Sequence, residues 1–377
     1  MYGELKAKFE RQYGRAAEYI FSAPGRTELG GNHTDHQHGL VLAAAVTLDT
    51  KAAAAENNDG CIRVMSEGYA PVTVRLNELE MQPEERNTTA ALVRGVAAGF
   101  VRRGYGVRGF DAYVVSDVLP GSGLSSSAAF EVLIGTVINA LSGGALSPAE
   151  IARIGQYAEN EYFGKPSGLM DQTASAVGGI VAIDFAECGY ALCIIDSGAD
   201  HAELTEEYAA ITNELKAVCR VFGKEHLREV DEHEFYARIA EVRRAAGDRA
   251  ALRAAHVFNE NKRCAEETAA LGNGDFERFL QLVTESGRSS WMYLQNVIPT
   301  GSTARQELAF ALLLCERLLG GRGAFRVHGG GFAGTVQAFV PVDMLAGFRA
   351  GIDAVLGAGS CHVLSIRHEG GCMMEKM

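Results

Sequence analysis

The sequence lacks the features that mark several classes of protein. No run of apolar residues approaches the roughly 20 that a membrane-spanning helix needs. Residues 1–19 are charged and amphipathic, without the apolar stretch of a signal peptide. The eight cysteines are scattered and include no C-x-x-C pair, so we expect free thiols in a reducing compartment, not a disulfide framework or a zinc ribbon. The net charge of −12 argues against nucleic acid as a partner. We therefore expect a cytoplasmic protein that binds neither membrane nor nucleic acid.

The composition is that of a folded chain, and its patterns predict an α+β protein. With 377 residues, 47% of them hydrophobic, the chain is long enough for two domains with substantial cores. Strands and helices are grouped in both halves and do not alternate strictly, which favours α+β. We place a boundary near residue 190. The predicted strands are 19–22, 51–56, 61–66, 71–75, 110–116, 181–185, 191–195, 324–327, 335–340 and 362–366, with a turn at 23–25 and a hairpin formed by 181–185 and 191–195.

A glycine- and serine-rich loop lies between an apolar run, 110–119, and a small-residue helical run, 128–141. Its glycines permit positive φ and a close approach to a bulky ligand, and the free N–H groups of the following helix favour an anion. The loop has no lysine, so it is not the G-x-x-x-x-G-K-[ST] phosphate loop. A turn that only caps a helix would have the same composition. If the loop binds phosphate, its contacts are Pro120, Gly121, Ser122, Gly123, Leu124, Ser125, Ser126, Ser127 and Ala128.

The densest polar segment, residues 26–39, precedes an apolar run. A polar, glycine-hinged loop next to buried strands is a typical place for binding groups. His33, Asp35, His36 and His38 are also ligand types for metal ions, so a metal cluster is an alternative to a substrate site.

Three further features carry chemical groups. Gly168-Leu169-Met170-Asp171-Gln172 places Asp171 at the start of a predicted helix, where it either caps the helix or acts as a base. Glu159 lies in the preceding predicted helix, on a face that would otherwise be solvated. A third glycine motif, Gly329 through Gly334, lies between two predicted strands, and its Phe332 is a residue type more often found in cores than against ligands.

In this order, the segments resemble the GHMP small-molecule kinases, and specifically their galactokinase branch. Gly25-Arg26 through Asp35 is similar to the sugar-binding motif, Pro120 through Ala129 to the phosphate loop, and Gly329 through Gly334 to the C-terminal glycine motif. Gly168 through Gln172 looks like the segment with the catalytic aspartate, and His201 through Tyr208 like the segment with a sugar-contacting tyrosine. Together these motifs span almost the whole chain.

The resemblance implies a fold, an activity and a set of site residues. It implies a two-lobed GHMP-kinase-like fold, with mixed sheets, helices packed on them, and an active site between the lobes. Residues 1–190 would bind nucleotide phosphates and sugar, and residues 191–377 would form a C-terminal α+β domain. The implied activity is ATP-dependent phosphorylation of the anomeric hydroxyl of galactose by a monomer or weak dimer. Asp171 would be the base, supported by Arg26; Arg26, Asn32, His33, Asp35, Gly168, Asp171 and Tyr208 would bind the sugar, and Ser127 and Glu159 would bind Mg²⁺.

The chain departs from this family at several positions. Galactokinases usually have Glu at Asn32, Asn at Glu28 and Tyr at His36, and an adenine-holding Trp is replaced by Thr89. An Arg expected just after Tyr208 is missing. Two alternatives therefore stay open: a kinase for another hexose or an amino sugar, and a catalytically silent sugar sensor. The presence of Arg26, Asp171 and an uninterrupted Gly-Leu-Ser-Ser-Ser-Ala-Ala loop favours catalysis.

Overall fold

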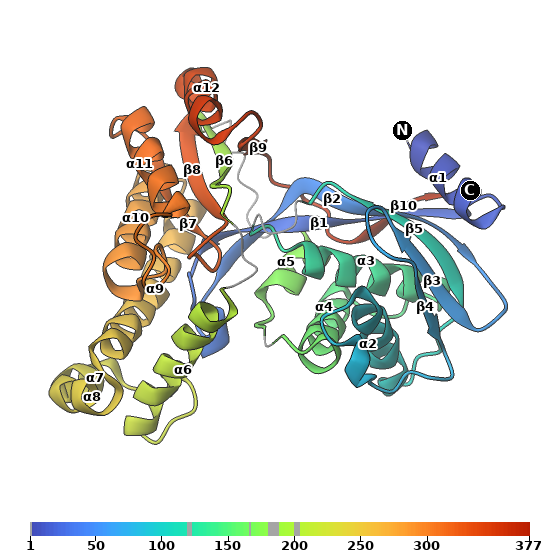
Figure 1. The fold of residues 1–377 in the computed structure, drawn as a ribbon, viewed down its shortest axis with the longest axis horizontal. Coiled ribbons are helices and arrows are strands. Elements are labelled where there is room, and N and C mark those ends of the chain that lie inside the picture. Colours follow the sequence, from blue (N-terminus) through green and yellow to red (C-terminus); the bar gives the residue numbers. More distant parts are fainter. Residues whose placement is uncertain (1, 119–122, 166, 180–187, 200–203) are drawn as a thin grey trace.

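The structure, a computed structural model, describes residues 2–118, 123–165, 167–179, 188–199 and 204–377. Within these ranges two sheets organise two lobes (Figure 1). The first sheet has the order β10-β1-β2-β5-β3-β4, from strands Cys372–Lys376, Tyr19–Gly30, Leu42–Glu56, Phe110–Ser116, Cys61–Ser66 and Val72–Arg75. The second has the order β7-β8-β6-β9, from strands Ala324–His328, Thr335–Pro341, Tyr190–Asp196 and Cys361–Leu364.

The helices are divided between the lobes in chain order (Figure 1). The first lobe contains α1 Gly3–Tyr13, α2 Thr89–Arg102, α3 Ser126–Leu141, α4 Pro148–Tyr157 and α5 Met170–Val177, with a π-helical turn, Ala158–Phe163, after α4. The second contains α6 Thr205–Val221, α7 Glu232–Ala237, α8 Ile239–Ala246, α9 Asp248–Gly272, α10 Phe276–Ser289, α11 Glu307–Leu319 and α12 Leu345–Leu356. No helix of the described ranges is long and apolar enough to span a membrane.

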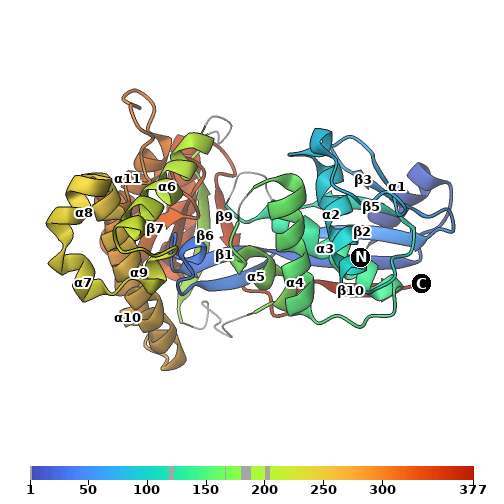
Figure 2. The same cartoon turned by 90° about the horizontal axis from the view of Figure 1, so that it is seen from below.

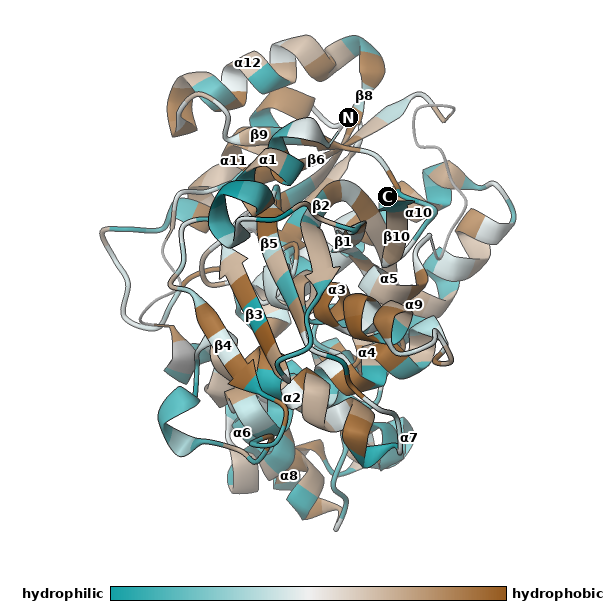
Figure 3. Ribbon diagram, turned by 90° about the vertical axis from the view of Figure 1, so that its right-hand side faces the viewer, coloured by the Kyte–Doolittle hydropathy of each residue, from teal (hydrophilic) through white to brown (hydrophobic). Residues whose placement is uncertain are grey.

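Alternating side chains place the first sheet between two helical layers. Ala52 and Ala54 of β2 contact the core made with α2, α3 and α4, whereas Ala53 and Ala55 face the small core made with α1. Successive side chains of a strand point to opposite faces, so an alanine run can serve both layers at close distance. Helix α3 is mostly hydrophobic in colour (Figure 3) because it is buried along nearly its whole length.

The second sheet is also covered on both faces. In β6, Leu192 and Ile194 pack into a core with α9 and α10, and Cys193 and Ile195 pack against α11 and α12. Helices α6 to α9 share a separate core that includes Phe332. The expectation that Phe332 is a core residue is thus confirmed.

Strands β1 and β2 are long enough to take part in both lobes (Figure 2). Their distal residues Leu29, Leu42, Ala44 and Val46 pack in the core of the second sheet and α10. In the other direction, β10 from the end of the chain pairs antiparallel with β1. The division near residue 190 stays a prediction, and these two connections cross it.

The predicted α+β fold is confirmed, and the strand predicted at 110–116 has those bounds. The turn predicted at residues 23–25 is wrong, because β1 continues through it to Gly30. The pairing of β1 with β2 shifts register between Pro24 and Arg26, and such a bulge accommodates a proline that cannot donate a ladder hydrogen bond. The Arg26 N–H instead donates to the Leu124 carbonyl at 3.0 Å.

The hairpin predicted for 181–185 and 191–195 has its first strand outside the described residues. Its second strand lies within β6, which pairs with β8 along one edge and with β9 along the other. Both partners come from the end of the chain. Neither β10 nor α12 is among the elements predicted from the sequence, and both lie in that same terminal part of the chain.

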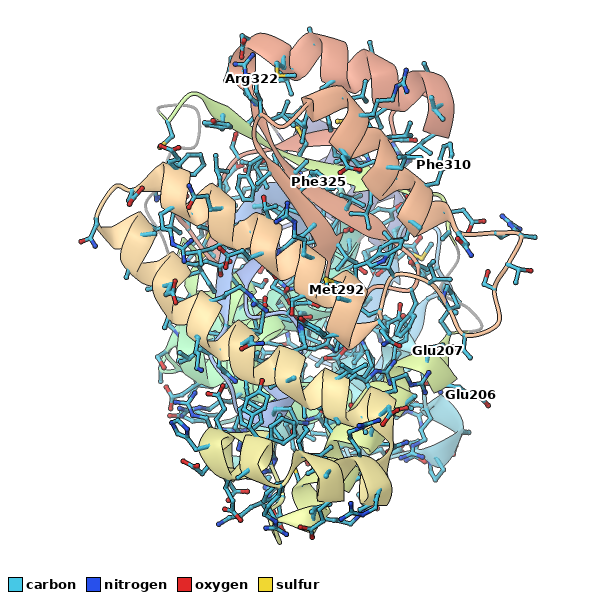
Figure 4. All side chains as sticks on the ribbon, turned by 90° about the vertical axis from the view of Figure 1, so that its left-hand side faces the viewer. Glu206, Glu207, Met292, Phe310, Arg322 and Phe325 are labelled. Atoms are coloured by element: carbon cyan, nitrogen blue, oxygen red, sulfur yellow. The ribbon has the colours of Figure 1, made fainter. Side chains whose placement is uncertain are left out.

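Truncating Phe339 of β8 tests the core of the second sheet. Its ring is fully buried and packs edge-on against Phe279 at 5.2 Å and Phe276 at 6.2 Å between centroids. Phe339→Ala should lower the free energy of unfolding by about 3–5 kcal/mol, because a buried ring leaves a cavity. Phe310→Ala is the control: Phe310 lies on the outer side of α11 and is 48% exposed (Figure 4), so its truncation should change stability by at most about 0.5 kcal/mol. Denaturant unfolding measures both, and equal losses would contradict the assignment.

Candidate functional site

A cavity of about 690 Å³ is formed by residues from both lobes. The polar segment at the end of β1 contributes most of its wall, the turn before α5 contributes a second side, and α6 and the third glycine motif close it from the other lobe. The lining residues are Arg26, Glu28, Gly31, Asn32, His33, Asp35, His36, His38, Gly39, Gln156, Asn160, Ser167, Gly168, Leu169, Met170, Thr212, Lys216, His226, Gly329 and Gly330.

At one end of the cavity Arg26 forms an ion pair with Asp171. Arg26 Nε and Nη2 lie 2.8 and 2.7 Å from Asp171 Oδ1, and Ser125 donates its hydroxyl to Asp171 Oδ2. Burial raises the pKa of Asp171, but the Arg26 charge and the Ser125 hydrogen bond outweigh it and lower that pKa below its usual value. Asp171 is therefore ionised at neutral pH. It lies in the first turn of α5 with its carboxylate turned to these partners, so the capping alternative is wrong.

Gly168 brings Asp35 close to the turn before α5. The Met170 N–H donates to Asp35 Oδ2 at 3.2 Å, and a Cβ built on Gly168 would overlap that carboxylate. The φ of Gly168 is not in the left-handed region, so the backbone conformation does not require glycine here. Glycine is needed because it lets Asp35 approach closely. Burial, together with the nearby charge of Asp171, raises the pKa of Asp35.

Two histidines of the first motif form a hydrogen-bonded chain. His33 Nε2 lies 3.0 Å from the Gly330 carbonyl, and His33 Nδ1 lies 3.1 Å from His36 Nε2. Gln37 Nε2 in turn lies 3.2 Å from His36 Nδ1. Burial lowers the pKa of His33 to about 3 and that of His36 to about 4, so both rings are neutral and each donates from Nε2. His33 adopts a positive φ of 58°, and its ring reaches the Gly330 carbonyl of the second lobe.

The metal-cluster alternative for this segment is not supported. His33 and His36 hydrogen-bond to each other, and His38 stacks on His226 at 3.7 Å between ring centroids. Across the described ranges, no three His, Cys, Asp or Glu side chains gather as a metal site.

Asn32 is fully buried at the cavity wall and makes its contacts with protein. Its Nδ2 donates to Glu28 Oε1 at 3.0 Å and to the Gly329 carbonyl at 2.7 Å. Its main chain is held from the second lobe by Glu260 and His256, at 3.2 and 3.1 Å.

Tyr208 lies against the third glycine motif. Its hydroxyl donates to the Gly331 carbonyl at 2.8 Å, and its ring packs edge-on against Phe332 at 5.7 Å. A Cβ at Gly330 would press on the Tyr208 ring, so the glycine allows this contact. Tyr208 is thus next to Gly330 of the cavity wall, although it is not itself among the lining residues.

The glycine- and serine-rich loop is described only from Gly123 onward. Pro120, Gly121 and Ser122 lie outside the described residues. Gly123 has a positive φ of 71°. It also has no side chain, and a Cβ at this position would meet His328 Nδ1 of the second lobe. Ser126 and Ser127 begin α3, Ala128 follows in the same helix, and both Ala128 and the preceding Leu124 are buried.

Glu159 is buried, so the alternative of a solvated helix face is wrong. It lies in the π-helical turn after α4 and is 2% exposed. Ser127 Oγ donates to its Oε1 at 3.1 Å, and Lys165 Nζ lies 3.2 Å from the same oxygen. A hydroxyl and a carboxylate are the hard oxygen ligands that Mg²⁺ prefers, so this pair fits the ion.

Some residues of the site were not predicted from sequence. Lys165 and Gln172 both contact Glu159, and Gln172 Nε2 bridges it to the buried Glu131 at 2.8 and 3.0 Å. Gln172 directly follows Asp171, and Lys165 lies close before Gly168 in the sequence. This closeness to two predicted site residues was the available signal. Thr212 and Lys216 on α6 had no motif around them.

Comparison with known proteins identifies the family. The GHMP kinase N-terminal domain matches residues 91–179, and the galactokinase galactose-binding signature matches residues 7–56. A galactokinase of Glaesserella parasuis is 32% identical over 363 residues, which is 91% of each chain. The chain belongs to the galactokinase family. A galactokinase of Actinobacillus pleuropneumoniae serotype 5b is 33% identical over 89% of this chain and 88% of its own.

Solved structures support the same family and fold. The galactokinase of Lactococcus lactis, determined in complex with galactose, matches with a TM-score of 0.83 and 26% identity over 99% of both chains. A mevalonate kinase matches with a TM-score of 0.65 and 15% identity, over 93% of this chain and 99% of its own, and shows the shared GHMP fold alone. The expected two-lobed architecture is confirmed.

A methyl group at Gly168 tests the close contact with Asp35. Gly168→Ala should lower kcat/KM at least tenfold, because the turn before α5 or the Asp35 carboxylate must move. Gly347→Ala in α12 is a matched control, since a Cβ there meets nothing within 4 Å. Steady-state kinetics measure the activity of both variants, and thermal unfolding shows whether each is folded. Loss of activity in both variants would contradict a specific role of Gly168.

Proposed function

We propose that the protein transfers the γ-phosphoryl group of ATP to the anomeric C1 hydroxyl of galactose, giving galactose 1-phosphate and ADP. The observation that carries this proposal is the ionised Asp171, held by Arg26 where the cavity meets the glycine- and serine-rich loop. The galactokinase relatives, and the match to a structure that contains galactose, support the choice of sugar.

Asp171 is the proposed base. As the C1 oxygen bonds to phosphorus, its proton passes to the Asp171 carboxylate, and the phosphorus–oxygen bond to ADP breaks. Arg26 keeps the carboxylate ionised before transfer, and its guanidinium offsets charge that develops on the attacking oxygen. Ser125 fixes the second carboxylate oxygen, which leaves Asp171 with one orientation.

The remaining residues position the substrates. Asn32, His33, Asp35, Gly168 and Tyr208 are proposed to surround the sugar, and the loop 120–128 to surround the ATP phosphates. Ser127 and Glu159 would hold Mg²⁺, which when bound neutralises phosphate oxygens. Lys165, on the same Glu159 oxygen, adds a positive charge close to that position.

The cellular setting is proposed on separate grounds. All eight cysteines are free thiols, which supports a reducing compartment such as the cytoplasm. A monomer or weak dimer is proposed because the cavity is formed by the two lobes of one chain.

The experiment that tests the function is a coupled ADP-release assay with a panel of free sugars. Galactose should give the highest kcat/KM, and release should require a divalent cation. Binding of galactose and ATP without ADP release would show a sensor in place of a kinase. A higher kcat/KM for an amino sugar would identify a different acceptor.

Replacement of the base gives a specific prediction. Asp171→Asn keeps the shape of the side chain but cannot accept a proton, so kcat should fall roughly 10²-fold or more. Galactose and ATP should still bind, as measured by calorimetry. A kcat close to that of the wild type would remove Asp171 from the role of base.

Replacement of its partner should shift the pH profile. The pKa of Asp171 is lowered because Arg26 and Ser125 outweigh burial, so removing the Arg26 charge leaves burial less opposed and the pKa rises. In Arg26→Gln the acid limb of kcat/KM should therefore move to higher pH, in addition to a lower maximum. An unchanged acid limb at reduced activity would mean that Arg26 does not control this ionisation.

A further inference from the structure

Glu28 is a carboxylate of the cavity wall with one free oxygen. It is 4% exposed, and it lies two residues from Arg26 on β1, so both side chains are on the cavity face of the strand. Its Oε1 accepts hydrogen bonds from Asn32 Nδ2 at 3.0 Å and from Arg326 Nη2 at 3.1 Å. Its Oε2 accepts none from any residue that the structure describes. The oxygen left for a molecule in the cavity is therefore Oε2.

The groups behind Glu28 hold it in this position. Arg326 is fully buried and also donates to the Glu28 carbonyl at 2.9 Å, so it fixes both the side chain and the main chain. Burial raises the pKa of Glu267 well above its usual value, so Glu267 is neutral. Burial also raises the pKa of Glu28, and the charges of Arg326 and Arg26 oppose that shift. Arg326 and Arg263 pair with the two remaining carboxylates, Glu28 and Glu260, and such pairing is the condition for keeping charged groups in a protein interior.

The side chain of Asn32 has fewer free hydrogen-bonding groups for a ligand than that of Glu28. Both N–H groups of its side chain are already donated to protein acceptors, Glu28 and Gly329, and its Oδ1 lies 3.3 Å from Asn296 Nδ2. The amide thus serves to orient the Glu28 carboxylate. The wall holds one carboxylate and one amide in direct contact, in the reverse order along the chain from that usual in galactokinases.

We propose that Glu28, through Oε2, binds a hydroxyl group of the sugar, and that the Glu28–Asn32 pair sets which sugar is accepted. This inference rests on the proposed function. It makes Glu28 a specificity-determining residue and Asn32 its positioning residue. The exchange of acid and amide between the two positions preserves a carboxylate at the wall.

The test compares Glu28→Gln with the wild type on galactose and on its 2-, 3-, 4- and 6-deoxy analogues. The carbonyl oxygen of the new amide stays toward Asn32 and Arg326, so an N–H₂ group replaces the free acceptor. On galactose, kcat/KM should fall roughly 10- to 100-fold. On the one analogue that lacks the bound hydroxyl, the two proteins should agree within about twofold. Equal losses on all five sugars would overturn the proposal, because a structural defect does not distinguish them.

Glu267→Gln is the matched control. Glu267 is also a buried carboxylate of the same network, but it lies behind Gly30 and does not line the cavity. Any loss that it causes should be the same on every sugar. A sugar-dependent loss in this variant would show that the pattern in Glu28→Gln comes from the network and not from a direct contact, and would overturn the proposal.

The exchange of the two residues tests the pair. Asn32→Glu alone places two carboxylates together, and Glu28→Asn alone leaves Arg326 with Glu260 as its one remaining carboxylate partner among the described residues, so each should lower galactose kcat/KM. The double variant should recover at least tenfold over the poorer single variant. Additive losses would mean that the residues do not act as a pair. If the wild type turns over no sugar, the proposed function fails, and calorimetric binding of the same sugars still tests Glu28.

Discussion

The contact between Arg26 and Asp171 joins the parts of this protein on which its chemistry depends. Arg26 comes from β1, which extends from the first sheet into the core of the second lobe, and Asp171 comes from the first turn of α5. Through its guanidinium Arg26 also binds the Gly123 carbonyl, at the start of the described part of the glycine- and serine-rich loop. One side chain thus fixes the proposed base and the loop relative to the cavity between the lobes. It does so because the bulge after Pro24 leaves β1 continuous.

The first motif is held from behind by buried charges. Uncompensated charges in an interior cost several kcal/mol each, and here guanidinium groups and carboxylates neutralise one another. Glu260 illustrates the balance: burial raises its pKa, but the charged groups around it, among them Arg263 and Arg326, outweigh burial and lower that pKa. Such a network fixes geometry more than it adds stability. Its position under Glu28 and Asn32 makes the cavity wall rigid where the sugar is proposed to bind.

Much of the site follows from local requirements of the backbone, which is why its motifs could be found in the sequence. Gly123 needs positive φ, and Gly168 needs the absence of a Cβ. The order of the glycine motifs indicated the family, and the strand predicted at 51–56 lies within β2. These features depend on a residue and its immediate neighbours, so composition and spacing carry them.

The sequence by itself determined the fold class, the family and the segments that carry the site, because each depends on short-range patterns. Tertiary structure alone decided how these segments meet. It extended β1 through a proline, placed β10 beside β1, and buried Glu159 in contact with Lys165. It also turned Glu28 to the cavity and used the donors of Asn32 within the protein. Contacts between residues far apart in the chain, such as Glu28 and Arg326, could not be predicted, because no regular spacing in the sequence marks them.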